Sequence, residues 1–185
     1  MTMRNAWIAI VLSTLASSAV KAEEAVVSYK SLGLELALDA ARAALKDCQK
    51  RGYQVAVAVV DRFGTPQVLL RDRFAGPHTP PTATGKAWTS ATFRNSTTEL
   101  NAISQPGMMQ AGLRNLPGVV IIGGGVMIEG GGAMLGAIGV SGAPAGMRTK
   151  PAPRQALPRS RTSLIFMVVS DYACFFSHSG NVAVS

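Results

Sequence analysis

Apolar residues first recur at helical spacing between Ser31 and Gly52. Leucines and alanines stand three or four positions apart along this segment, and Cys48 falls on the same stripe. This spacing predicts an amphipathic helix that buries Cys48 as a small core residue. Lys50 and Arg51 occupy its last turn, where cations favour the helix dipole, and Gly52 suits the left-handed conformation that ends many helices.

Two runs of strand character follow this helix. Tyr53–Val60 is rich in β-branched and small residues, and Pro66–Arg71 returns as a second run after turn-forming residues at 61–64. The pattern predicts an antiparallel hairpin. A second helix is predicted over Thr82–Leu100. Small residues share one of its faces and would let another element or a flat ligand approach the helix closely: Ala83, Ala87 and Ala91.

Glycines alternate with short apolar runs between Val119 and Gly146. A dinucleotide-binding fingerprint needs glycines at relative positions one, three and six after a strand. In both glycine clusters the sixth position holds a large apolar residue, Ile128 in one and Leu135 in the other, so the spacing excludes this motif. Tight glycine turns between short strands are the better interpretation. The three predicted strands are 119–122, 126–128 and 133–140.

The order of predicted elements is therefore helix, strand, strand, helix and three further strands. Hairpins dominate this order, which predicts an α+β fold with an antiparallel sheet of about five strands flanked by helices. The 185 residues are enough for one domain with a substantial core.

The amino-terminal segment has the three regions of an export signal. Arg4 precedes an apolar run at 6–15, and Val20 and Ala22 occupy the small-residue positions before a cleavage site. The run is too short to span a bilayer comfortably. We therefore expect a signal peptide at 1–22, cut after Ala22. The mature protein is then periplasmic or secreted in a bacterium, with no membrane span after cleavage.

The net charge of +8 is concentrated at the two ends of the chain. The first 22 residues hold two basic residues, and the segment after Met147 holds five basic residues against one acidic residue, which leaves +2 for residues 23–147. A nucleic-acid-binding face concentrates lysine and arginine on the folded body, so nucleic acid is not an expected partner. No Cys-x-x-Cys or His-x-x-x-His spacing occurs, and no structural zinc site is expected either.

Three stretches of the chain carry a family resemblance: "VAVVDRFGTPQVLLRDRFAGPHT", "TGKAWTSATFRNSTTEL" and "LPGVVIIGGGVMIEGGGAMLGAIGVSGAPAG". They resemble the GlcG/HbpS-like family of small haem-binding proteins from about Leu32 to Gly146, within a predicted domain at 23–147. The resemblance implies a profilin-like fold, assembly into homo-oligomers, and haem or a related tetrapyrrole as ligand. Trp88 stands where the family usually has tyrosine.

The segment at 148–185 departs from the family pattern. The resemblance implies an acidic final helix there, whereas this segment is basic and contains Pro151, Pro153 and Pro158, which prevent a continuous helix. We expect a poorly ordered, proline-rich tail. It arises either from a lost reading frame near Met147 or from a genuine extension, and a body without the covering helix would be less stable.

Haem binding requires an axial ligand, an apolar contact surface and cations for the propionates. On the strength of the resemblance, His78 is the expected axial ligand to the iron, with Phe74 beside it and Arg73 or Lys86 as propionate partners. Weaker candidate ligands also occur: Tyr53, Met108 and Met109.

No catalytic constellation is visible in the sequence. The leading hypothesis is therefore an exported haem-binding protein that sequesters, delivers or degrades haem. The alternatives are an enzyme or accessory protein that acts on a small organic acid or a corrinoid without haem, and an unstable remnant that has lost its function.

Overall fold

The computed structural model describes residues 27–143, so the predicted signal peptide at 1–22 and tail at 148–185 lie outside the described residues. Within 27–143 no helix is long and apolar enough to cross a bilayer. The helices and strands follow one another as α2 (Leu34–Lys50), β1 (Ala56–Asp61), β2 (Pro66–Arg71), α3 (Thr79–Phe93), α4 (Thr97–Ile103), the 3-10 helix η3 (Ala111–Asn115), β3 (Gly125–Gly130) and β4 (Ala133–Ser141).

The strands form one antiparallel sheet in the order β2-β1-β4-β3. In the interior of the sheet, Val57 of β1 lies between Leu70 of β2 and Val140 of β4. Two hairpins, β1–β2 and β3–β4, thus meet side by side through β1 and β4. The predicted α+β class and the antiparallel sheet are confirmed.

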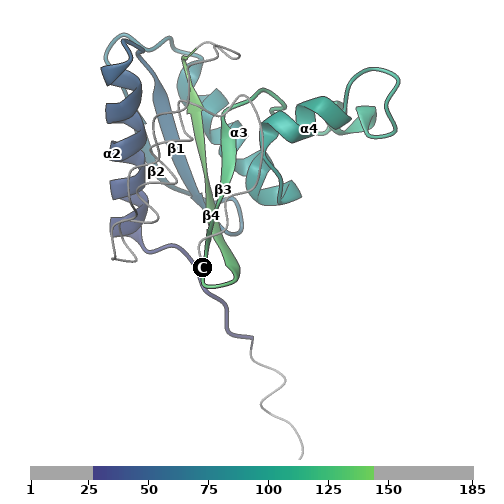
Figure 1. Ribbon diagram of the computed structural model, residues 1–185, viewed down its shortest axis with the longest axis horizontal. Coiled ribbons are helices and arrows are strands. Elements are labelled where there is room, and N and C mark those ends of the chain that lie inside the picture. Colours follow the sequence, from purple (N-terminus) through teal and green to yellow (C-terminus); the bar gives the residue numbers. More distant parts are fainter. Residues whose placement is uncertain (1–26, 144–185) are drawn as a thin grey trace, which may run out of the picture.

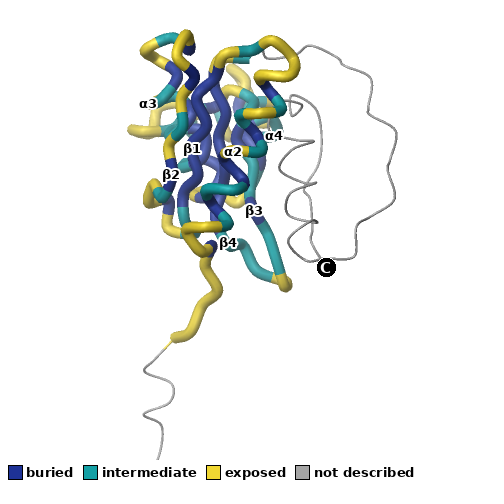
Figure 2. The backbone as a smooth tube through the Cα atoms, turned by 90° about the vertical axis from the view of Figure 1, so that its left-hand side faces the viewer, coloured by how far each residue is buried: buried dark blue, intermediate teal, exposed yellow. Residues whose placement is uncertain are grey.

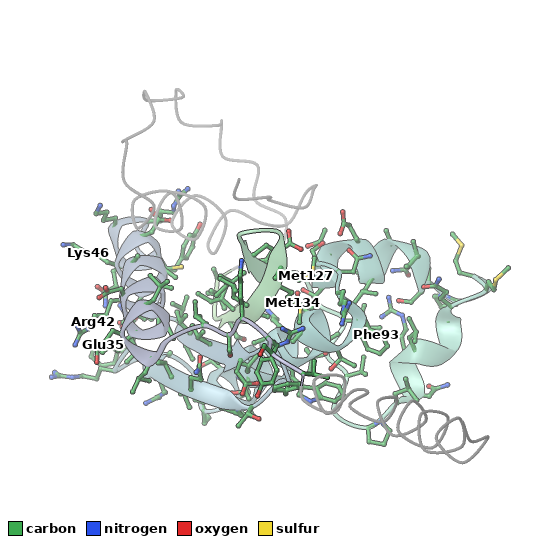
Figure 3. All side chains as sticks on the ribbon, turned by 90° about the horizontal axis from the view of Figure 1, so that it is seen from below. Glu35, Arg42, Lys46, Phe93, Met127 and Met134 are labelled. Atoms are coloured by element: carbon green, nitrogen blue, oxygen red, sulfur yellow. The ribbon has the colours of Figure 1, made fainter. Side chains whose placement is uncertain are left out.

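Helices cover both faces of this sheet (Figure 1). Helix α2 lies against β1 and β2 on one face, while α3 crosses β1, β4 and β3 on the other. The exposed charged side chains of α2, among them Glu35, Arg42 and Lys46, point away from the sheet (Figure 3). The strands therefore lie in the middle of the molecule, where the backbone is most completely buried (Figure 2).

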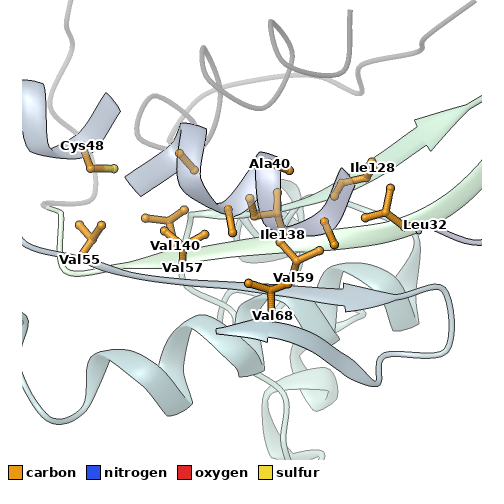
Figure 4. Close-up of a cluster of buried hydrophobic side chains, with 13 residues drawn as sticks. Leu32, Ala40, Cys48, Val55, Val57, Val59, Val68, Ile128, Ile138 and Val140 are labelled. Carbon is orange, nitrogen blue, oxygen red and sulfur yellow. The ribbon is translucent and has the colours of Figure 1, made fainter. Parts of the chain in front are cut away.

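The core on the α2 side contains branched aliphatic side chains. Val57 and Val59 of β1 and Ile138 of β4 are fully buried there, under a row of alanines from α2 (Figure 4). Cys48 is also fully buried in this cluster, which confirms that it is a core residue. Alternate β1 residues point to opposite faces, so Ala56 and Ala58 face α3 instead.

Small residues bring α3 unusually close to the sheet. A Cβ atom on Gly139 of β4 would lie 2.1 Å from the carbonyl oxygen of Ala83, and one on Gly125 of β3 would lie 2.5 Å from that of Lys86. The helix therefore packs on glycine backbone, and the small face predicted around Ala87 is confirmed as a close-packing surface. A second group of glycines makes the β3–β4 turn, where Gly131 has a positive φ of 57°.

Two predictions about individual elements are wrong. Residues 119–122 form no strand, so the described sheet has four strands where about five were expected. The amide of Val120 donates instead to Thr89 Oγ1 of α3 at 2.9 Å, and the Val120 side chain occupies the space left open by Gly85. The segment therefore packs along α3 and forms no strand ladder.

The helix predicted over Thr82–Leu100 is in fact two helices. Arg94 adopts a left-handed conformation with φ 51° that ends α3. Ser96 then caps α4 by a capping box with Glu99, in which each side chain accepts from the other residue's backbone amide. Helix α3 also begins earlier than predicted, at Thr79, because Pro80 is tolerated in the first turn.

Candidate functional site

His78 stands at the start of α3, on the loop that connects this helix to β2. Its backbone is helical, with φ −75° and ψ −18°, and its side chain is exposed. The imidazole ring lies against Gly76, where an added Cβ would come within 2.8 Å of Cε1 and 2.9 Å of Nδ1. Since glycine leaves that space open, the ring can lie flat along the loop.

Buried polar contacts hold this loop in place. Asp72 is buried, and its carboxylate accepts from the Val55 amide at 3.0 Å and from Gln49 Nε2 at 2.5 Å. The amide of Ala75 donates to the Asp72 carbonyl at 3.1 Å, and the Arg71 guanidinium donates to the carbonyl of Ala75. The loop is thereby tied to β1 and α2, and it presents His78 from a fixed base.

Arg73 and Phe74 lie on the same loop as His78. Both side chains are exposed, and Phe74 keeps 79% of its surface accessible. An aromatic ring left this open gains nothing from the core of its own domain. The loop thus offers an imidazole, an aromatic ring and a guanidinium to solvent within six residues.

Lys86 occupies a different environment. It is buried, and its Nζ donates to the carbonyl oxygen of Val140 on β4 at 3.0 Å. Burial lowers the pKa of Lys86 to about 8 because the charged ammonium loses its hydration. It stands eight residues after His78, which corresponds to roughly 12 Å along a helix. The structure therefore groups Arg73 and Phe74 with His78, and it does not bring Lys86 to that exposed loop.

The other candidate ligands are remote from the loop in the fold. Tyr53 is half-buried beside the α2-side core. Met108 and Met109 follow α4 and are 52% and 100% exposed. Neither group belongs to the β2–α3 connection that carries His78.

The chemistry available at the loop is that of a single imidazole. Within the described residues no group of three or more histidine, cysteine, aspartate or glutamate side chains is placed to hold a metal ion. A haem needs fewer protein ligands than a bare ion, because the macrocycle supplies the equatorial nitrogens and the protein adds an axial group. One exposed imidazole with an aromatic ring and a guanidinium beside it fits that requirement.

Sequence reasoning missed Asp72 and Gln49 as supports of this loop. The dipeptide of Arg71 and Asp72 at the end of a predicted strand indicates a turn, but the burial of the carboxylate depends on where α2 ends in space. No local pattern carries that information.

Comparison with known proteins follows from this geometry. Residues 32–147 match the family described as haem-degrading protein HbpS-like. A crystal structure of HbpS is 36% identical, covers 68% of this chain and 86% of that chain, and superposes with a TM-score of 0.62. A double mutant of Streptomyces reticuli HbpS is 31% identical, with coverage of 88% and 98% and a TM-score of 0.64.

A third solved structure, a complex of PduOC with haem, is 27% identical to this chain. It covers 78% of this chain and 93% of that chain, with a TM-score of 0.60. Among curated proteins none matches the chain. Because the family match spans most of the residues from β1 to β4 and α2 with them, the chain belongs to the HbpS-like family.

Proposed function

We propose that this chain is an exported haem-binding protein that sequesters or delivers haem. The observation that carries the proposal is its membership of the HbpS-like family, together with its likeness to a solved haem complex. The export signal expected at 1–22 supports a role outside the cytoplasm.

The exposed loop before α3 supplies the residues for this function. His78 binds the iron from its exposed ring, and Phe74 covers part of the porphyrin face with an otherwise unused aromatic surface. Arg73 pairs with a propionate, because its guanidinium is exposed and carries a permanent charge. Lys86 contributes indirectly, since its Nζ is already engaged by Val140 on β4.

A haemin titration of the purified mature protein tests the proposal. The wild type should give a saturable shift of the Soret band, and His78→Ala should weaken the affinity by at least about tenfold, the effect of losing an axial ligand. Met109→Leu is the matched control, because it removes an exposed candidate thioether far from the loop while keeping its size. That variant should bind as the wild type does.

Two outcomes separate the parts of the proposal. A Soret shift that persists unchanged in His78→Ala removes the ligand assignment and leaves haem binding intact. Absence of any shift in a sample with a folded far-UV spectrum contradicts haem binding, and favours the alternative of a small organic acid or corrinoid as ligand. Mass spectrometry of protein from the periplasmic fraction should show Glu23 as the first residue.

A further inference from the structure

Residues Thr97–Gly118 project from the layered body as an arm, which comprises α4, the following turns and η3. Figure 1 shows this arm extending sideways from the edge of the sheet, beyond α3. Of the described elements, α4 borders only α3 and β3. The body therefore leaves most of the arm's surface free.

Hydrogen bonds within the arm hold it in one shape. The capping box of Ser96 and Glu99 starts α4, and Leu100, which is 3% exposed, anchors it to the body. Arg114 then fastens η3 back onto α4. Its Nε donates to the Ser104 carbonyl at 2.6 Å, and its Nη2 donates to Asn101 Oδ1 at 2.7 Å. Such a preorganised projection loses little entropy when it binds a partner.

The surface of the arm is apolar and almost uncharged. Glu99 and Arg114 are its only charged residues, and both are used in the internal hydrogen bonds described above. Several large apolar side chains are exposed on it: Ile103 at 40%, Met108 at 52%, Met109 at 100% and Leu116 at 47%. Depletion of charge together with exposed methionine is the composition of a protein interface core.

We infer that the arm is the contact through which this chain associates with a second copy of itself. In a two-fold contact the same patch faces itself, so any net charge on it would be repelled by its own image. A neutral, methionine-bearing patch has no such penalty, and it needs no partner of opposite charge. Nucleic acid and anionic lipid are disfavoured, because the arm's one cation is already bound to Asn101.

The inference does not depend on haem, so its test uses haem-free protein. Sedimentation velocity of the mature chain, measured over a wide concentration range, should show a concentration-dependent mass above that of one chain. The double variant Met108→Glu/Met109→Glu places charge on the patch and should weaken association by at least about tenfold. Far-UV circular dichroism should be unchanged, since both side chains are exposed.

Leu69→Glu is the matched control, because Leu69 is 50% exposed on β2, away from the arm. It should associate as the wild type does. A wild type that stays monomeric at every concentration overturns the inference, as does association that survives the double variant or is lost equally in the control. Monomeric protein that sediments with neutral phosphatidylcholine vesicles, and no longer does so in the double variant, would assign the arm to a lipid surface instead.

Methionine oxidation provides a second readout without substitution. Met109 is fully exposed in a single chain, so dilute protein should be oxidised rapidly by hydrogen peroxide. Association should slow oxidation of Met108 and Met109 several-fold as protein concentration rises. A rate independent of concentration, in protein that sediments as an oligomer, would place the contact elsewhere and overturn the inference.

Discussion

Lys86 shows how a single residue couples the fold to pH. Its buried ammonium has a pKa of about 8, against an ordinary value of 10.5. Between these values the unfolded chain binds a proton that the folded chain has released, so stability must rise with pH across this window. The full difference corresponds to about 3 kcal/mol, and the folded state bears that cost at and below neutral pH.

Lys86→Met should therefore flatten the dependence of stability on pH. Urea unfolding at several pH values between 7 and 10.5 should show the wild type gaining free energy of unfolding as pH rises, with a clearly smaller gain in Lys86→Met. The comparison of slopes is needed because the substitution also removes the donor to the Val140 carbonyl. Lys46→Met, at an exposed position of α2, should keep the wild-type slope. Parallel profiles for wild type and Lys86→Met would show that the ammonium is not buried as described.

The residues of the candidate site were predictable from the sequence only through resemblance. His78 is one histidine in a loop, and no periodicity distinguishes a ligand from an exposed side chain. The burial of Lys86 lies beyond any local pattern, because it depends on Val140 of β4, which is 54 residues away. Phe74 is informative only after its exposure of 79% is known.

At the scale of elements, helix α3 depends on the absence of side chains beneath it. A Cβ on Gly139 would meet the carbonyl oxygen of Ala83 at 2.1 Å and the amide nitrogen of Ala87 at 2.7 Å. Both are backbone atoms, so no side-chain rotation relieves the clash and the whole helix must shift. Gly139→Ala should lower the free energy of unfolding by at least about 2 kcal/mol, as overpacking of a core does.

Gly112→Ala is the control for this prediction. Nothing lies within 4 Å of a Cβ built on Gly112 in η3, so its effect should stay within about 0.5 kcal/mol. Chemical denaturation of both variants measures the difference. Equal stability of Gly139→Ala and the wild type would mean that α3 does not pack on β4 as closely as the structure shows.

Elements with a strong local pattern were predicted well. The stripe that ends at Cys48 gave α2, and the turn residues between Asp61 and Gly64 gave the β1–β2 hairpin. The β-branched run 119–122 has equal strand propensity, but the tertiary contact of Val120 with Thr89 decides its conformation. The break between α3 and α4 had a readable signal, since Ser96 and Glu99 have capping-box spacing.

At the scale of the whole molecule, charge and fold occupy different parts of the chain. Residues 23–147 carry only +2 of the total of +8, and the segment after Met147 carries five basic residues. Non-specific binding to DNA depends on how many cations contact the phosphates and weakens steeply with salt. Any affinity of this protein for DNA should therefore come from the terminal segment and not from the sheet and helices.

Removal of the residues after Met147 should abolish that affinity. Fluorescence anisotropy with a labelled DNA duplex should show weak binding of the mature chain at low salt, which disappears as sodium chloride approaches physiological concentration because the bound cations are replaced. The shortened chain, checked by far-UV circular dichroism, should show no binding even at low salt. If it binds DNA as tightly as the mature chain does, the body carries a cationic surface that the near-neutral charge of residues 23–147 does not predict.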